Sequence, residues 1–236
     1  MDTSFYTGIR GVKTQQERMN VISNNIANVN TYGYKTKNSS FQDMLYYNQR
    51  DRAGEVTNLT AGTGALHSHI TTDFSGSGFH VSGGALDFAI NGEGFFKLQD
   101  PQTGEVTYTR NGHFGQSRRS DGFYLVTDSG KFVVDSQGQP IRVNQGELSR
   151  QPAVYDFANT DGMLSIGNNE FAPVEKNGNA TLVVDAQLVN GYLEMSNVDL
   201  AKEMADTIEA SRAYSYVLKM VQTADEVEQT INELRG

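Results

Sequence analysis

The chain of 236 residues contains no cysteine and no tryptophan, and it has only four prolines. The lack of cysteine excludes disulfides, thiolate chemistry and any zinc site with cysteine ligands. No apolar run approaches the ~20 residues that a membrane-spanning helix needs. Residues 1–16 lack the long apolar core and the small-residue cleavage site of a secretory signal. If the protein leaves the cell, we expect it to be exported without a cleaved signal peptide.

The chain also has fewer positive than negative side chains. The chain has 19 Lys and Arg against 28 Asp and Glu, which gives a net charge of −9. Proteins that bind nucleic acid through its phosphates carry a basic patch, and here Arg118 and Arg119 form only a pair. The composition therefore predicts neither nucleic-acid binding nor membrane insertion, and the length allows one large domain or two modest ones.

Residues 200–234 carry the strongest periodicity in the sequence. Apolar or small residues recur there at steps of three and four, and no Pro or Gly intervenes, which predicts one continuous helix about 50 Å long. A pattern sustained over about five heptads is typical of a coiled coil, and a long core helix of a bundle is the alternative. This apolar seam consists of Leu200, Met204, Ile208, Ser211, Tyr214, Val217, Val221, Ala224, Val227, Ile231 and Leu234.

A second helix is predicted at the other end of the chain, over residues 3–29. Its stop signal is Asn30-Thr31 followed by Gly33, residue types that end helices and tolerate left-handed backbone. Because the chain holds only these two helices with such a pattern, we expect them to pair side by side. The near-heptad positions are Ile9, Val12, Gln16, Met19, Ile22, Ile26 and Val29.

The first helix has an unusual second face. Asn20, Asn24 and Asn28 lie opposite Ile22, and no charged residue occurs between Met19 and Tyr34. A solvated helix face normally carries Glu and Lys, whereas Asn is a poorer helix former whose amide both donates and accepts hydrogen bonds. The pattern favours contact with another protein surface, and an uncharged face open to solvent is the alternative.

The chain between the helices falls into two parts. Residues 36–75 contain an apolar-aromatic patch at 41–47, and Gly54, Gly62 and Gly64 should break regular elements. We expect an extended arm whose patch either docks on a partner or folds back. Residues 76–190 are predicted to form an antiparallel β domain. Asn-Gly or Asp-Gly dipeptides, each a hairpin-type turn signal, stand at 91–92, 111–112, 121–122, 161–162, 177–178 and 190–191.

These observations predict an α+β protein, in which an antiparallel β domain is inserted between two long terminal helices that pair as a coiled coil. Four parts follow along the chain. They are the first helix of a discontinuous helical domain (1–35), the arm (36–75), the β-rich domain (76–190) and the second helix of the helical domain (191–236).

The sequence offers little catalytic or metal-binding chemistry. His67 and His69 would share one side of a strand, so a two-ligand metal site is conceivable, but only Asp73 is near and two surface histidines are the simpler interpretation. Gly92-Glu93-Gly94 precedes a strand-like run, which does not fit a dinucleotide loop. No catalytic set of residues stands out. We therefore predict neither an enzyme nor a bound cofactor.

Four segments carry a resemblance to a known family. Ser23–Lys35, which reads SNNIANVNTYGYK, closely resembles the amino-terminal signature of the flagellar axial proteins of rod, hook and hook-associated type. Residues 191–201 resemble the second signature of the same family, near the carboxyl terminus. Residues 86–96 and 108–114 are similar to the rod proteins in particular, of the proximal or distal rod type.

This resemblance implies a structural subunit of the bacterial flagellar basal-body rod. Such a subunit would self-assemble into a helical tubular shaft that carries torque and encloses the export channel, outside the cytoplasm and next to other rod and hook proteins. A short hook or hook-junction protein is the alternative within the family. A secreted coiled-coil adhesin is the alternative from another class, although it should carry a signal peptide.

The amide face and the apolar seam together give the expected contacts between subunits. On the first helix these are Asn20, Ser23, Asn24, Asn25, Ile26, Asn28 and Val29. On the second helix they are Leu200, Met204, Ile208, Val217, Val221, Ala224, Val227, Ile231 and Leu234.

Overall fold

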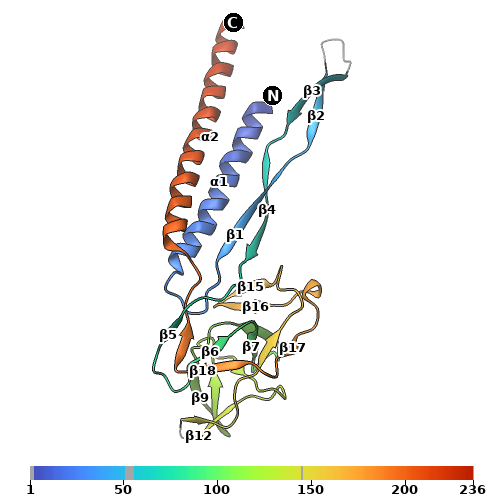
Figure 1. Cartoon of the computed structure of the whole chain (residues 1–236). Coiled ribbons are helices and arrows are strands. Elements are labelled where there is room, and N and C mark those ends of the chain that lie inside the picture. The colour runs from blue at the N-terminus through green and yellow to red at the C-terminus, as the bar shows by residue number, and fades with distance from the viewer. Residues whose placement is uncertain (1–2, 51–55, 145, 236) are drawn as a thin grey trace. The chain divides into compact units, whose positions relative to one another are not determined.

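The computed structural model describes residues 3–50, 56–144 and 146–235 (Figure 1). The chain forms two compact units. The helical unit comprises Met1–Ala27, Lys37–Thr71 and Asp199–Gly236, and the β unit comprises Asn28–Thr36 and Thr72–Val198. The helical unit holds both long helices, α1 (Thr3–Ala27) and α2 (Leu200–Arg235). The predicted α+β class and both predicted helices are thus confirmed, and no helix among the described residues is long and apolar enough to cross a membrane.

Local sequence explains where α2 begins. The Asp199 carboxylate accepts hydrogen bonds from the backbone N–H groups of Ala201 (3.0 Å) and Lys202 (3.2 Å), which would otherwise lack partners in the first turn. After this cap, the 36 residues of α2 contain neither Gly nor Pro. The helix therefore runs unbroken to Arg235.

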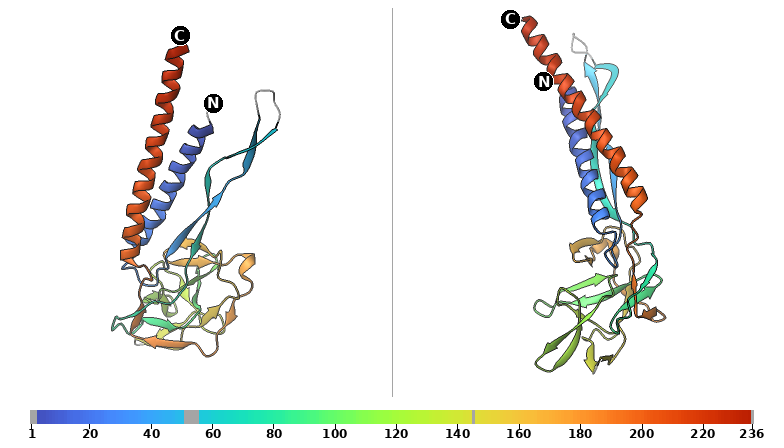
Figure 2. Two further views of the ribbon diagram at one scale, coloured as in Figure 1. Left: turned by 45° about the horizontal axis from the view of Figure 1, so that its top comes forward. Right: turned by 90° about the vertical axis from the view of Figure 1, so that its left-hand side faces the viewer.

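The two helices pack side by side and run in opposite directions (Figure 2). Later residues of α1 contact earlier residues of α2: Gly8 lies against Val221, Gly11 against Val217, and Arg18 forms an ion pair with Asp206. Since α1 has 25 residues and α2 has 36, the last turns of α2 extend beyond the start of α1. The carboxyl-terminal end of α2 is consequently left without α1 beside it.

The arm is more regular than the sequence suggested. It contains β1 (Lys37–Asp43), β2 (Tyr46–Arg50), β3 (Val56–Gly62) and β4 (Ala65–Thr72), with β1 paired to β4 and β2 paired antiparallel to β3. Gly62 ends β3, and Gly64 adopts a φ of 104° in the turn before β4. Gly62 and Gly64 therefore do mark breaks between strands, as expected, and the strands form on either side of them. The third expected break, Gly54, lies outside the described residues.

The β unit contains the remaining strands. Its main sheet has 11 strands and follows the order β13-β12-β10-β11-β7-β8-β16-β15, with β9 on β10, β14 on β7 and β17 on β14. Two further pairs, β18 with β6 and β19 with β5, stand apart from it, and the pairings are antiparallel. The bounds are β5 Phe79–Val81, β6 Phe88–Asn91, β7 Phe95–Gln99, β8 Val106–Thr109, β9 Gly115–Arg119, β10 Gly122–Val126, β11 Phe132–Val133, β12 Arg142–Asn144, β13 Glu147–Leu148, β14 Val154–Asp156, β15 Leu164–Gly167, β16 Glu170–Ala172, the 3-10 turn η1 Glu175–Asn177, β17 Thr181–Leu182, β18 Gln187–Asn190 and β19 Tyr192–Glu194.

Strand β7 organises the core of the β unit. Its side chains alternate between two apolar clusters, as successive residues of a strand point to opposite faces. Phe96 and Leu98 pack in one cluster with Leu125 and Val133, whereas Phe95 belongs to a second, aromatic-rich cluster. Because both faces of β7 are covered, Phe95, Phe96 and Leu98 are all apolar and buried, with only Lys97 between them, and this run after Gly94 is strand-like in the sequence.

The six dipeptide turn signals were only partly correct. Gly92, Gly122, Gly162, Gly178 and Gly191 do have positive φ, but only Asp121-Gly122 stands at a hairpin, between β9 and β10. At the other five sites the strands on the two sides of the dipeptide do not pair with each other, so the expected hairpins were wrong there. Conversely, Asn168 and Asn169, with φ of 52° and 56°, close the β15–β16 hairpin without a glycine between them.

Candidate assembly surfaces

The contact between α1 and α2 depends on two glycines of α1. A Cβ atom at Gly8 would stand 2.6 Å from Val221 Cγ2, and one at Gly11 would stand 3.1 Å from Val217 Cγ1. Hydrogen in place of a side chain thus lets Val217 and Val221 lie directly on the backbone of α1. At this point the surfaces of α1 and α2 within one chain are complementary in shape.

A buried polar contact lies further along the same interface. The Asn25 amide donates to Glu203 Oε1 (3.0 Å) and to the Lys37 carbonyl (2.9 Å), and its oxygen accepts from the Lys37 N–H (3.0 Å). Asn25 and Glu203 are 2% and 4% exposed. Burial raises the pKa of the Glu203 carboxyl, and the hydrogen bond from Asn25 opposes that shift. One amide therefore joins α1, β1 and α2.

A groove opens between α1 and β4 on another side of the helical unit. Its volume is about 520 Å³. Asn20, Val21 and Asn24 line it from α1, and Leu66 and Ile70 line it from β4. The remaining lining residues are Glu17, Lys37 and His67. Two of the three asparagines of the predicted amide face therefore form part of a concave surface.

Helix α2 exposes apolar side chains along much of its length. Met204 and Ile208 near its start are 53% and 57% exposed, and Leu234 near its end is 83% exposed. The buried α2 residues are instead Glu203 and Ala210. In the first three turns of α2, the residues that pack inward therefore come one position earlier or two positions later in the sequence than the nearest residues of the predicted seam, such as Glu203 before Met204 and Ala210 after Ile208.

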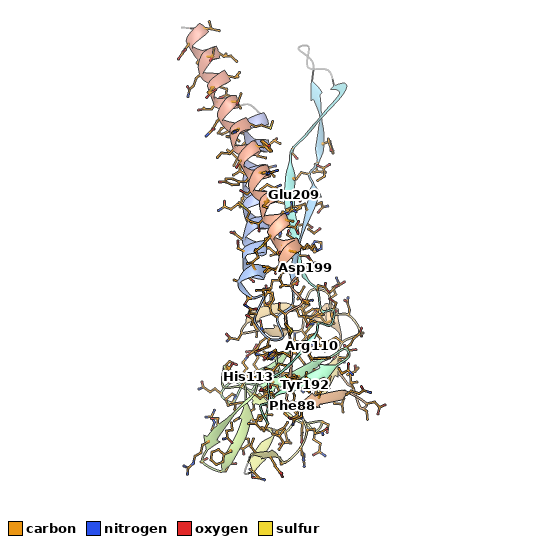
Figure 3. All side chains as sticks on the ribbon, turned by 60° about the vertical axis from the view of Figure 1, so that its left-hand side comes forward. Phe88, Arg110, His113, Tyr192, Asp199 and Glu209 are labelled. Atoms are coloured by element: carbon orange, nitrogen blue, oxygen red, sulfur yellow. The ribbon has the colours of Figure 1, made fainter. Side chains whose placement is uncertain are left out.

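In the β unit, a buried ion cluster joins segments from both ends of the chain. Lys35 Nζ lies 2.8 Å from Glu194 Oε1, and Arg110 Nε lies 2.9 Å from Glu194 Oε2, with all three side chains 0–3% exposed. Arg110 also donates to the carbonyls of Gly92 (2.7 Å) and Gly94 (2.6 Å). Figure 3 labels Arg110 among the strands of this unit, Asp199 just before the first turn of α2, and Glu209 on α2.

Close backbone contacts hold the same segments together. Gly33 has a φ of 68°, and a Cβ there would stand 2.5 Å from the Asn111 nitrogen, so no other residue fits without movement. The Gly33 N–H donates to the Glu194 carbonyl (2.8 Å), and the Gly191 N–H donates to the Asp87 carbonyl (2.8 Å). The four segments that carried the family resemblance thus meet in one place.

Comparison with known proteins agrees with this convergence. Family models match at residues 5–35 (flagella basal body rod protein), 89–166 (flagellar hook protein FlgE/F/G D1 domain) and 189–234 (flagellar basal body rod FlgEFG protein C-terminal). The flagellar basal-body rod protein FlgG of Bacillus subtilis is 33% identical, over 98% of each chain. FlgG of Buchnera aphidicola from Schizaphis graminum is 31% identical, over 99% of this chain and 100% of its own. FlgF of Caulobacter vibrioides is 30% identical, over 100% and 99%.

The chain belongs to the flagellar basal-body rod protein family. It is a structural subunit of the rod, and the family is not enzymatic. The resemblance to rod proteins read from the sequence is confirmed, and the adhesin alternative is not supported. The basal body is accordingly the place where this rod protein works.

The structure distributes the expected contact residues of this rod protein over several environments. Asn20, Ser23 and Asn24 are exposed on α1, Asn25 is buried, and Ile26 is half-buried. Asn28 and Val29 are half-buried and belong to the β unit. On α2, Val217, Val221 and Ala224 are half-buried. The exposed members of the α2 set are Leu200, Met204, Ile208, Val227, Ile231 and Leu234.

Sequence reasoning missed several residues that organise these surfaces. Gly8 and Gly11 were noticeable as two glycines three residues apart within a helical pattern, a spacing that places both on one face. Lys35 and Glu194 were noticeable as charges inside the two terminal signatures. Within the described ranges, no group of three or more His, Cys, Asp or Glu side chains is placed to hold a metal ion.

Proposed function

We propose that this rod subunit assembles with copies of itself into a helical tubular shaft, in which α1 and α2 form the inner layer around an export channel. The observation that carries the proposal is the exposed apolar surface of α2, which includes Met204 and Ile208. Large apolar patches on a soluble unit mark protein contacts, and burying one such side chain is worth about 1.5–3 kcal/mol. In the shaft, neighbouring subunits would bury these apolar side chains of α2.

The proposed shaft carries torque and works outside the cytoplasm. Antiparallel helices packed through Gly8 and Val221 give a stiff unit along the axis, and contacts between different surfaces of successive copies propagate without closing. In the array we propose coiled-coil packing for residues 217–234 and subunit contacts for the exposed members of the expected set. Export without a cleaved signal peptide remains a prediction.

We propose a division of labour along the chain that follows the four parts expected from sequence. Residues 1–35 and 191–236 supply the helical layer and its connections to the β-rich part, 36–75 form the arm, and 76–190 form the outer body. The exposed side chains of Phe41, Leu45 and Tyr46 on the arm suit contacts with other rod and hook proteins.

The test uses the purified full chain and one pair of substitutions. Ile208→Asp adds charge to the exposed apolar face of α2, while Ser215→Asp adds the same charge at an exposed polar position. We expect the parent chain and Ser215→Asp to form fibres in electron micrographs and to sediment as polymers, and Ile208→Asp to stay monomeric with unchanged helix content. Normal fibres and normal motility with Ile208→Asp would contradict the proposal.

A further inference from the structure

The carboxyl-terminal tip of α2 presents an apolar stripe beyond the reach of α1. Val227, Ile231 and Leu234 are 52%, 50% and 83% exposed. Their spacing of i, i+4 and i+7 places them on one side of the helix, the arrangement by which amphipathic helices insert into grooves. Figure 2 shows this end of α2 extending past the start of α1. The stripe therefore needs a partner surface elsewhere.

The groove between α1 and β4 has the complementary form. Val21, Leu66 and Ile70 give it an apolar lining, and Leu66 and Ile70 are 54% and 50% exposed although they line a concave surface. Asn20 stands exposed on its α1 side, and the amide of an asparagine can donate hydrogen bonds. Such donors suit the end of a helix, where the last four carbonyl groups lack partners within the helix.

Charge also favours this pairing. The stripe is surrounded by Asp225, Glu226, Glu228 and Glu233, and the carboxyl-terminal end of a helix adds a partial negative charge. The groove is lined by Lys37, and Lys13 lies one turn before Glu17 on the same side of α1. Glu17 is the one like charge in the lining. An acidic helix end with apolar anchors is thus the occupant that fits.

We propose that the tip of α2 in one copy docks into the groove between α1 and β4 of the next copy. The inference rests on the proposed self-assembly and names the two surfaces that carry it. A chain cannot fill its own groove, because its tip points past the start of α1 while the groove begins at Glu17, about 20 Å further along that helix. Tip and groove are different surfaces, so the contact repeats head to tail.

The absence of cysteine from the sequence allows a direct test with the full chain. Ile231→Cys protein is mixed with a tagged Leu66→Cys protein, and disulfide formation between the two is followed under mild oxidation. We expect the mixed dimer to form at least roughly tenfold faster than in two control mixtures, because docking raises the effective concentration of the thiols. The controls replace Ile231→Cys by Thr230→Cys, off the stripe, or Leu66→Cys by His69→Cys, which is exposed on β4 but does not line the groove.

A second measurement removes the contact without a crosslink. Ile231→Asp should raise the protein concentration needed for assembly roughly tenfold or more while helix content stays unchanged, because the residue is exposed in the single chain. Combining it with Leu66→Lys should restore part of the assembly, since the new charges attract each other across the proposed contact.

The outcomes separate this inference from the proposed function. Fibres of the parent chain that give no crosslink above the controls would overturn the docking and leave self-assembly standing. A parent chain that stays monomeric at every concentration and enters no rod would overturn self-assembly, and the docking with it. If Leu66→Cys crosslinked in motile cells only to a different flagellar protein, a second copy would be the wrong occupant.

Discussion

Gly8 of α1 and Val221 of α2 lie so close that a Cβ atom on residue 8 would stand 2.6 Å from Val221 Cγ2. Two effects of a Gly8→Ala substitution therefore oppose each other. Alanine raises helix propensity by about 1 kcal/mol, but it also forces a methyl group against a stiff β-branched side chain. Overpacking of this kind costs about 1–3 kcal/mol, so the steric effect should prevail.

We accordingly expect Gly8→Ala to lower the free energy of unfolding of the helical unit, as measured by the loss of helical circular dichroism on heating. Val221→Ala in the same chain should recover much of the loss, because it removes the methyl group that is struck. The matched comparison is Gly11→Ala, whose added Cβ would meet Val217 Cγ1 at the longer distance of 3.1 Å. A stabilised Gly8→Ala protein would show that the helices can move apart at no cost.

A second prediction concerns the independence of the two units. Val221→Asp places a carboxylate against α1, where burial is unfavourable, and the lost apolar contact alone costs about 1.5–3 kcal/mol. The β unit has its own apolar clusters, built on residues such as Phe96 and Phe95. We expect calorimetry to show an unchanged transition for the β unit and a weakened one for the helices.

Thr230→Asp is the control for this substitution, because Thr230 is exposed on the same helix and lies away from α1. It should change neither transition. If Val221→Asp instead lowered both transitions together, the helices and the sheet would share one cooperative core.

A third prediction follows from the buried carboxyl of Glu203. Its pKa in the folded chain is raised, chiefly by burial, so its contribution to stability is present below the unfolded pKa of about 4.5 and is lost as the pH rises through the folded value. Glu203→Gln keeps an oxygen for the Asn25 amide and removes the charge. The variant should be more stable than the parent at pH 7, by roughly 1 kcal/mol, the scale of one buried polar group.

The pH dependence distinguishes this charge effect from a gain in stability that does not depend on the charge of residue 203. Near pH 4 the parent carboxyl is protonated too, so the two proteins should have nearly the same helical melting temperature. Glu209→Gln serves as the comparison, because Glu209 is exposed and touches Arg18 at 3.4 Å. It should not stabilise at pH 7. An equal gain for Glu203→Gln at both pH values would argue against the burial explanation.

The helices and the fold class could be predicted from sequence because their signals are local. Periodicity over residues 200–234 and the stop at Asn30-Thr31 fixed both helices to within two residues. The inward face of α2 could not be predicted in the same way. Glu203 and Ala210 are buried instead of Met204 and Ile208, because α1 selects what packs against it: the Asn25 amide, for example, binds the Glu203 carboxyl. That selection is a property of two distant segments together.

The same limit applies to the β unit. Turn-forming dipeptides identified where the chain bends, yet the strand after Asn190-Gly191 pairs with β5 and the strand before it with β6. Pairing of that kind depends on the whole sheet. The ion cluster could not be predicted for a similar reason, since Lys35 and Glu194 stand 159 positions apart in the sequence. Family resemblance marked both segments without indicating that they touch.

The last prediction concerns this cluster, in which one buried carboxylate serves two buried cations. Glu194→Gln keeps the shape of the side chain but leaves Lys35 and Arg110 without a counter-ion, and an uncompensated buried charge costs about 3–5 kcal/mol. We expect the urea midpoint of the β unit to fall steeply at pH 7. Arg142→Gln breaks an exposed ion pair with Asp121 instead and should leave the midpoint nearly unchanged, since solvent screens such pairs.

The pH profile of Glu194→Gln gives an independent check. Burial already lowers the pKa of Lys35, and Glu194 is the main group that opposes this shift. Without the carboxylate, the folded chain should release the Lys35 proton at a still lower pH. The unfolded chain then binds more protons than the folded one over the window up to the ordinary lysine pKa of 10.5, so stability rises with pH there. The loss relative to the parent should therefore shrink between pH 7 and pH 9. A loss that stays constant across this range would mean that packing around Glu194, rather than its charge, holds the two terminal signatures together.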